Sequence, residues 1–413
     1  MRSISIAVLA AVLAPICASA AVAEPLTFDT ALRLALHNAP SLQAKAADVD
    51  GARSAALAAG RLPDPKLRFG VENYPVSGPP AGSFTADSMT MATVGVMQDM
   101  PNGAKRRAER LKASADVDLA SANAALETRD VRLNTALAWI DLYYAQRKLA
   151  ALDEAQQAIQ SISATAPSQV AAGSLRPAQS LDGDLLNAQL ADRRVELAAN
   201  VAKARAELIR WTGDESADVA GSPPDYVVNE ANLRAGLDHN PALLSLGAMT
   251  QQANADVVLA RADKRPDWGW DVTYQHRDPR WGDMVSTGVT ISLPLFQKSR
   301  QDPVVEAKAA GLTRARLDQD AAYRQLHAQL DADLADHAMH HDRLIRSQTT
   351  LVPLAEKKVQ LETASYGAGN ASLSDVQQAQ LALAEARIDA LSREADVARD
   401  GIRINLTYGT DAQ

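Results

Sequence analysis

Four segments of the chain alternate apolar and polar residues, which is the pattern of β-strands with one apolar and one polar face. Each is about ten residues long, which suits a tilted strand that crosses a lipid bilayer. The second segment, rich in methionine, keeps the alternation poorly, and four strands of a soluble sandwich are the alternative interpretation. We predict strands with one face toward lipid and one toward water, at about 66–75, 88–100, 267–276 and 284–293.

The segments after each pair of strands repeat their apolar residues every seven positions, as helices in coiled coils do. Leu119, Leu126, Leu133 and Ile140 form one such series, and alanines occupy the complementary seam position. A helix over about 101–165 would be on the order of 95 Å long, wider than an ordinary globular domain. Proline and glycine interrupt the pattern near 167–177 and 366–370. We therefore predict two antiparallel helical hairpins, with helices at about 101–165, 177–212, 300–365 and 371–408.

The two halves of the chain share one plan. Several short motifs recur in the same order with similar gaps, which indicates an internal duplication. His37-Asn38-Ala39-Pro40 recurs as His239-Asn240-Pro241, Pro63-Asp64 as Pro266-Asp267, Gly95-Val96 as Gly288-Val289, Met100-Pro101 as Leu293-Pro294, and Ala188-Gln189-Leu190 as Ala379-Gln380-Leu381. We predict a mainly α chain with a β-barrel part, built from repeats at 24–220 and 221–413. Each repeat has the order helix, strand, strand, helix, helix.

The N-terminus has the pattern of a secretory signal. Arg2 precedes an apolar run from Ile4 to Ala14, and Ala21-Val22-Ala23 supplies a small-residue cleavage site. We predict a signal peptide over residues 1–23. The single cysteine, Cys17, lies inside it and lacks the usual sequence before a lipidated cysteine. The mature chain is therefore expected to have no disulfide, no thiolate metal ligand and no lipid anchor.

Composition and charge exclude several classes of function. Only 4% of the residues are aromatic while 47% are hydrophobic, much of it alanine, which suits long packed helices. Acidic and basic residues are interleaved along the chain, and their formal net charge of −8 offers no basic surface for nucleic acid. No metalloprotease helix motif, Gly-rich phosphate loop or nucleophile elbow occurs, so we expect neither an enzyme nor a cofactor. After the leader there is no apolar run of about eighteen residues, so a membrane crossing would have to use the strands.

Strands in hydrocarbon must close into a barrel, because each unpaired backbone group there costs several kcal/mol. Known barrels begin at about eight strands, and one copy of this chain supplies only four. Several copies must therefore combine their strands around one axis. Three copies would give twelve strands above a cylinder of helical hairpins.

Motifs along essentially the whole mature chain resemble the TolC family of outer-membrane efflux factors. Leu26-Thr27-Phe28 with Asn38-Ala39-Pro40 is similar to the family's N-terminal signature, and Leu62-Pro63-Asp64-Pro65 to its entry into the first strand. Tyr366-Gly367-Ala368-Gly369, followed by Ser372 and Asp375-Val376, resembles the tip of the second hairpin. The first tip departs from that pattern, with Gly173 and Leu175 between Pro167 and Pro177.

The resemblance implies a homotrimer in outer-membrane lipid with its helical tunnel in the periplasm. Its tips would contact a periplasmic adaptor and an inner-membrane pump of the RND type. By the matching motif Asp375 is a candidate for an acidic entrance gate, with Asp182 or Asp184 as its counterpart. Like charges from three copies would raise some of their pKa values, whereas the alternative is a solvated acid at a helix N-terminus. The residues expected to contact the adaptor are Gly173, Leu175, Tyr366, Gly369 and Ser372.

The sequence of the strand region most resembles that of the Czc/Cus-type channels of heavy-metal efflux. The motifs Asn73-Tyr74-Pro75 and Met89-Thr90-Met91 belong to this resemblance. The function predicted is a passive conduit for heavy-metal cations. His337, His340 and His341 lie within about one helical turn and are metal-ligand candidates, although packing explains them as well. Methionines of the second strand could contact a soft ion but suit packing better. Drug efflux, protein secretion and a soluble periplasmic coiled-coil scaffold are the alternatives.

Overall fold

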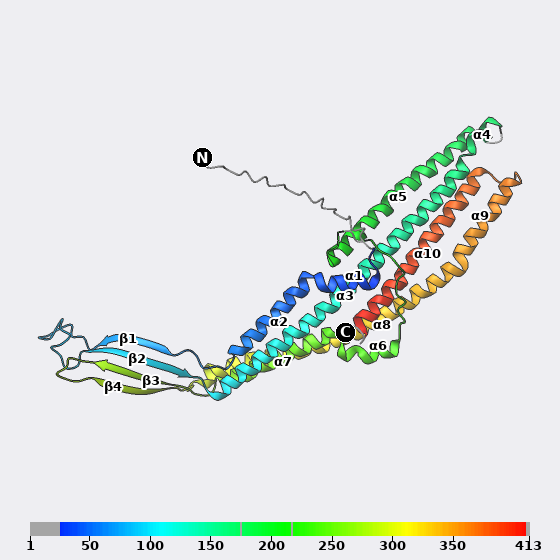
Figure 1. The fold of residues 1–413 in the computed structure, drawn as a ribbon. Helices are drawn as coiled ribbons and strands as arrows, with labels where there is room; N and C mark the ends of the chain where they lie inside the picture. The colour runs from blue at the N-terminus through cyan, green and yellow to red at the C-terminus, as the bar shows by residue number, and fades with distance from the viewer. Residues whose placement is uncertain (1–24, 174–175, 216–217, 410–413) are drawn as a thin grey trace, which may run out of the picture.

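The computed structural model describes residues 25–173, 176–215 and 218–409. The predicted signal peptide with Cys17, and Leu175 of the first tip, lie outside the described residues. The molecule is elongated, with a β-sheet at one end and the turns of two helical hairpins at the other (Figure 1).

The sheet contains four antiparallel strands in the order β1-β2-β3-β4. They are β1 (Lys66–Glu72), β2 (Met91–Met100), β3 (Asp267–His276) and β4 (Met284–Ser292). The central pairing joins the two halves of the chain, because β2 belongs to the first half and β3 to the second. β1 ends at Glu72 because Asn73 has a positive φ of 55° and Pro75 follows two residues later.

The register gives the sheet one apolar and one polar face, as the alternation predicted. Residues directly opposite in an antiparallel pair point to the same face. Val94 lies opposite Phe69 and Tyr274 on the apolar face. Met97 lies opposite Lys66 and Asp271, so this methionine belongs to the polar face. β2 therefore keeps the two-face rule poorly, as its sequence indicated.

The helices of both halves run from the sheet toward the opposite end of the molecule. None of those in the described part of the chain is both long and apolar enough to cross a lipid bilayer. In the first half they are α1 (Phe28–Asn38), α2 (Pro40–Ala58), α3 (Gly103–Ser163), α4 (Ala166–Ala171) and α5 (Pro177–Thr212). In the second half they are α6 (Glu230–Gly236), the 3-10 turn η1 (Leu237–His239), α7 (Pro241–Ala262), the 3-10 turn η2 (Gln297–Ser299), α8 (Gln301–Arg346), the π turn η3 (Ser347–Leu351), α9 (Val352–Gly367) and α10 (Leu373–Tyr408).

The helices differ from the predicted ranges in two places. The short helix expected before each pair of strands is broken in two, at Pro40 in the first half and at Pro241 in the second, because the residue before a proline avoids the helical conformation. The long helix expected at 300–365 is interrupted by the π turn, just before Pro353. Proline lacks the N–H that an uninterrupted helix needs, so the hydrogen-bond ladder changes there.

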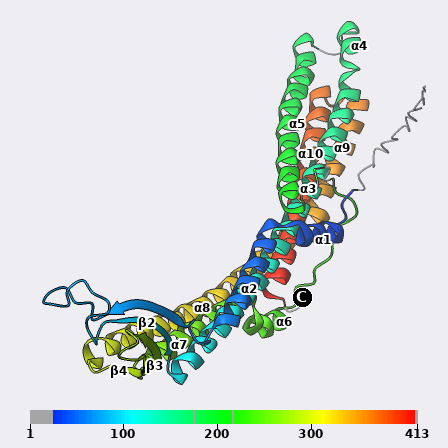
Figure 2. The same cartoon turned by 60° about the vertical axis from the view of Figure 1, so that its left-hand side comes forward.

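The long helices form one curved layer. Near the sheet, α3 packs between α2 and α7, and α7 packs against α8. Farther away, α3 packs between α5 and α10, and α10 packs against α9. α3 therefore runs through both parts, and Figure 2 shows the layer bending where α1 and α6 lie.

The main core lies at this bend and is built around Trp139. The indole is fully buried and its Nε1 donates to the Leu26 carbonyl at 2.9 Å. Phe28 meets it edge-on and Tyr143 stacks on it, with ring centroids 5.6 and 5.4 Å away. The N-terminal segment is thereby fixed to the middle of α3.

We expect Trp139→Ala to lower the free energy of unfolding by about 3–5 kcal/mol, because it leaves a large cavity in this core. Denaturant titration of the detergent-solubilised protein measures the effect. The matched control is Trp281→Ala, since Trp281 is 47% exposed. Equal losses for the two variants would contradict the central role of Trp139.

Candidate functional site

The apolar face of the sheet is open. Phe69, Val289 and Ile291 are 71%, 69% and 57% exposed, and Trp268 and Tyr274 on the central strand are 45% exposed. A continuous apolar surface of this kind marks contact with lipid or with another protein. On the opposite face Lys66 pairs with Asp99 at 2.7 Å, and Arg68 and Asp271 lie on the same side. The sheet can therefore separate hydrocarbon from water.

The loops that connect the strands at the far end are tied together. Arg277 of the β3–β4 loop donates to the carbonyl of Ser88 at 3.3 Å, and Arg280 donates to that of Thr85 at 2.8 Å. Both acceptors belong to the β1–β2 loop. The two loops therefore form one cap on the end of the sheet.

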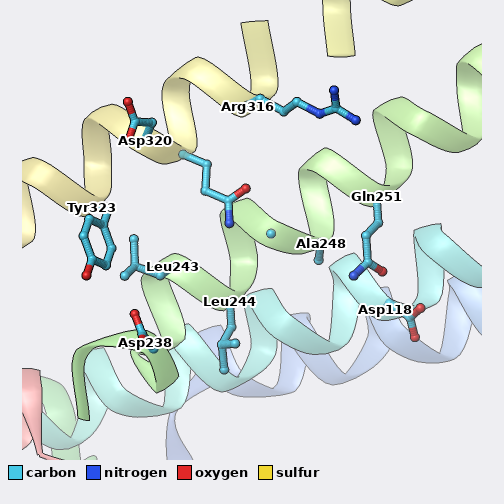
Figure 3. A pocket seen from close by; sticks show the side chains of 11 residues that line it. Asp118, Asp238, Leu243, Leu244, Ala248, Gln251, Arg316, Asp320 and Tyr323 are labelled. Atoms are coloured by element: carbon cyan, nitrogen blue, oxygen red, sulfur yellow. The ribbon is translucent and has the colours of Figure 1, made fainter. Parts of the chain in front are cut away.

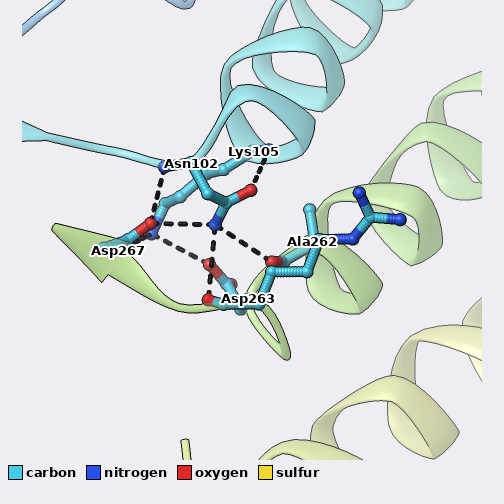
Figure 4. Close-up of polar contacts among 6 residues, drawn as sticks. Asn102, Lys105, Ala262, Asp263 and Asp267 are labelled. Atoms are coloured by element: carbon cyan, nitrogen blue, oxygen red, sulfur yellow. Dashed lines mark hydrogen bonds and ion pairs between the residues drawn. The ribbon is translucent and has the colours of Figure 1, made fainter. Parts of the chain in front are cut away.

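A polar network joins the sheet to the helices (Figure 4). Asp267, the first residue of β3, accepts hydrogen bonds from the Asn102 backbone N–H at 2.7 Å and from its side-chain amide at 2.8 Å. Asn102 also caps α3 by accepting from the Lys105 N–H. Lys105 pairs with Asp263 at 2.9 Å, and that hydrogen bond raises the pKa of the ammonium group. We call Asn102, Lys105, Asp263 and Asp267 the junction network.

The two hairpin tips share a turn geometry despite their different sequences. Gly173 and Gly369 have φ values of 74° and 77°, a conformation that glycine adopts without strain. Gly369 donates to the Tyr366 carbonyl and Asn370 to that of Ser365, which is a Schellman ending. Gly173 makes the corresponding bond to Val170. The similarity was hidden in the sequence because flanking residues of the two tips differ.

The tips also pack against each other within one chain. The Gln169 amide donates to the Tyr366 hydroxyl, and Leu373 packs with Ala166 in a small buried cluster. Deeper in the layer, the Gln377 amide donates to Ser163 Oγ at 2.8 Å. The two hairpins therefore end as a single unit.

The predicted gate acids have different surroundings. Asp375 accepts hydrogen bonds from the backbone N–H and the hydroxyl of Ser372, at 2.8 and 2.7 Å, in a capping box at the start of α10. These bonds lower the pKa of its carboxyl. Asp182 and Asp184 are exposed on α5 and flank Gly183, which is buried against Ser163 and Gln377. Asp375 thus has the helix-capping role that the sequence left as its alternative.

The three predicted histidines do not share one environment. His340 Nδ1 lies 2.6 Å from Asp400 Oδ2, and the Asp400 side chain is only 9% exposed. His337 has a buried Nδ1 that finds no hydrogen-bond partner among the described residues, and burial lowers the pKa of its imidazole. His341 is exposed, with its ring centroid 6.4 Å from that of His337. Over the described ranges, no group of three or more His, Cys, Asp or Glu residues is placed to hold a metal ion.

Several hollows lie on the described part of the helical layer. One, of about 650 Å³, is bounded by α3, α7 and α8, with Asp118, Arg316 and Asp320 on its rim and Leu243 and Ala248 at its floor (Figure 3). A second, of about 520 Å³, lies between α5 and α10. Its lining combines apolar residues, including Leu186, Leu190 and Ile388, with charged ones, Arg193, Glu385 and Asp389. Neither holds a constellation of nucleophile, base and oxyanion donors.

Comparison with known proteins identifies this architecture. The sequence profile described as outer membrane efflux protein matches residues 31–214 and again residues 233–410. The double match confirms the internal duplication and the resemblance drawn from the sequence.

Individual relatives agree with the family match. The chain is 24% identical over 381 residues to the cobalt-zinc-cadmium resistance protein CzcC of Cupriavidus metallidurans, covering 89% of this chain and 86% of that protein. The fold is similar to that of CusC, a protein that forms a transmembrane channel, with a TM-score of 0.81, 15% identity and 92% of each chain covered. It is also similar to the outer membrane protein VceC of Vibrio cholerae, with a TM-score of 0.78, 18% identity, and 92% and 96% of the two chains covered.

The capping box at the second tip can be tested by hydrogen exchange. Ser372→Ala and Asp375→Asn should each speed amide exchange in the first turn of α10, on the order of fivefold, because the cap is lost or weakened. Asp184→Asn is the matched control, an exposed acid of the other hairpin. The pKa of Asp375 is lower in the folded state, so the cap persists above the ordinary carboxyl pKa. It should be lost as pH falls through the lowered value. Unchanged exchange in both cap variants would contradict this role.

Proposed function

The chain belongs to the outer membrane efflux protein family, and on that premise we propose that three copies form a passive conduit for heavy-metal cations. Membership of the family places the sheet in the outer membrane and the helices in the periplasm as a tunnel. One structural observation supports the assembly: the sheet has an apolar and a polar face, and its edge strands β1 and β4 each lack a second partner in the part of the chain that the structure describes.

The number of copies follows from the strand count. Four strands cannot enclose a bore, and edges left open in hydrocarbon would leave backbone groups unpaired. Three copies around one axis provide twelve strands, which lies within the range of known barrels. The apolar face then contacts lipid and the polar face surrounds water.

The proposed cargo is a divalent metal cation. It is supported by the similarity to a cobalt-zinc-cadmium resistance protein over most of both chains. A conduit needs no tight binding site for its cargo, and a formal charge of −8 is compatible with cation passage. The channel performs no chemistry in this proposal, and the energy for export comes from an inner-membrane pump.

The hairpin tips are the proposed site of contact with a periplasmic adaptor. Gly173, Gly369, Tyr366 and Ser372 lie at the end of the molecule farthest from the sheet, where the turns are exposed on a firmly packed base. The hollow between α5 and α10 begins near this end and offers further contact area. The better candidates for an acidic entrance ring are Asp182 and Asp184, whose side chains are exposed. The carboxyl of Asp375 already accepts two hydrogen bonds from Ser372 in the capping box of α10.

Deleting the gene in its host should reduce tolerance to cobalt, zinc and cadmium, and leave tolerance to a drug panel unchanged. Growth across a concentration series of each agent, with cell-associated metal measured in parallel, checks this prediction. Re-expression of the wild-type chain is the control. Sensitivity to drugs alone would contradict the cargo while keeping the channel, and no change in either would contradict the function.

A further inference from the structure

The second half of the chain has positive charge that it does not neutralise, at the junction between the sheet and the helices. Arg265 precedes β3, and Lys298 and Arg300 lie between β4 and α8. All three side chains are exposed, and none of them forms an ion pair or a hydrogen bond within the described residues. We call Arg265, Lys298 and Arg300 the basic cluster.

The acids closest to the basic cluster in sequence already have partners. Asp263 and Asp267 belong to the junction network, where they face Lys105. Asp302, in the first turn of α8, pairs with Lys264 at 2.7 Å. The positive charge of the basic cluster is therefore left for a partner that is not part of the described chain.

A hollow of about 220 Å³ lies at the basic cluster. Its charged lining consists of Arg265 and Arg300 with the two acids of the junction network. Gln301 also lines it, and the Oε1 atom of this side chain is buried with no hydrogen-bond partner among the described residues. The remaining lining is mostly apolar and includes Leu293, Leu295 and Phe296. The hollow therefore offers two guanidinium groups and an unused acceptor beside apolar side chains.

Exposed apolar side chains continue past the end of the sheet at this point. Leu293, Leu295 and Phe296 are 61%, 74% and 70% exposed, and Trp268 on the apolar face is 45% exposed. Aromatic side chains with basic ones beside them are typical of the boundary between a bilayer and water. The family places the sheet in the outer membrane and the helices in the periplasm. The junction therefore lies at the periplasmic surface of the bilayer, at the level of lipid headgroups.

We propose that the hollow binds the headgroup of an anionic phospholipid from the periplasmic leaflet. Arg265 and Arg300 bind the phosphate, since a guanidinium group matches phosphate oxygens in geometry and charge. Gln301 Oε1 accepts a hydrogen bond from a headgroup hydroxyl, as phosphatidylglycerol can donate. The acyl chains lie against Phe296 and the apolar face of the sheet.

Charge and exposure together favour this ligand over others. A zwitterionic lipid would bring its own cation next to the basic cluster, whereas an anionic lipid neutralises it. A free phosphate ion would leave Leu295 and Phe296 exposed to water, and a phospholipid covers them. The site goes beyond the proposed cargo and rests only on the placement of the sheet in the outer membrane.

Fluorescence quenching by brominated lipids tests the site. Phe296→Cys, with Cys17→Ser so that no other cysteine is present, carries a bimane label beside the hollow in protein reconstituted into vesicles. Brominated phosphatidylglycerol should quench this label with an apparent affinity about tenfold higher than brominated phosphatidylcholine, as basic side chains near an anionic headgroup predict. Val289→Cys is the matched control, because Val289 is exposed on the apolar face in the middle of β4. There the two lipids should quench equally.

Removal of charge identifies the side chains that bind the headgroup. Arg265→Ala combined with Arg300→Ala should abolish the preference for phosphatidylglycerol at position 296. Arg316→Ala combined with Arg346→Ala is the matched control, since both are exposed arginines of α8 that form no ion pair within the described residues. It removes the same charge and should leave the preference unchanged. Inorganic phosphate, compared with chloride at equal ionic strength, should not displace the lipid.

Several results would overturn the headgroup site. Equal quenching by the two lipids at position 296 would do so, as would displacement of the lipid by inorganic phosphate. Loss of quenching by both lipids at this position alone would show that protein covers the hollow, and would overturn it too. Absence of quenching at position 289 would instead contradict the membrane placement of the sheet. Metal tolerance of cells that produce the Arg265→Ala and Arg300→Ala variant reports the conduit separately, so the site can fail while the proposed function holds.

Discussion

Backbone hydrogen bonding at the two edges of the sheet is the constraint on which the rest of the structure depends. Within the described residues, β1 and β4 each have one side without a strand partner. In water such an edge can be solvated, but in hydrocarbon it must be paired. The apolar face commits the sheet to hydrocarbon, and the unpaired edges then require other copies. In the proposed assembly, the need to pair these edges in hydrocarbon brings the copies together.

Internal duplication explains how one short sequence meets this requirement. Each half brings a two-stranded unit and a helical hairpin, and the halves join through β2 and β3 in the sheet and through α3 in the layer of helices. The junction network keeps the sheet and the helices in fixed relation, because Asp267 holds the residue that caps α3. The same elements, repeated around an axis, can extend the layer without a new type of contact.

Much of the fold could be predicted from the sequence because its signals are local and periodic. The alternation in β3 and the heptads of α3 are such signals, and the recurring motifs revealed the duplication. The poor alternation predicted for the second segment is present in β2, where the apolar Met91 and Met97 lie on the polar face, opposite Glu72 and Asp271.

The candidate site was less predictable because its contacts join distant parts of the chain. Asp400, sixty residues from His340, gave no local sign of that pairing. The capping role of Asp375 could have been recognised, since Ser372 precedes it by three residues at a helix start. Pro353 inside a predicted helix was likewise a visible sign of the interruption there.

The π turn before Pro353 makes the two halves mechanically unequal. α3 is one continuous helix of 61 residues from the sheet to its tip. Its counterpart in the second half, α8 with α9, is an interrupted helix, because the five-residue π turn between them has a looser hydrogen-bond pattern. A force applied at the hairpin tips would be transmitted toward the sheet mainly along α3, whereas the interrupted α8–α9 helix would bend at its π turn. In the proposed tunnel, the stiffer α3 and the more flexible α8–α9 would then alternate around the wall.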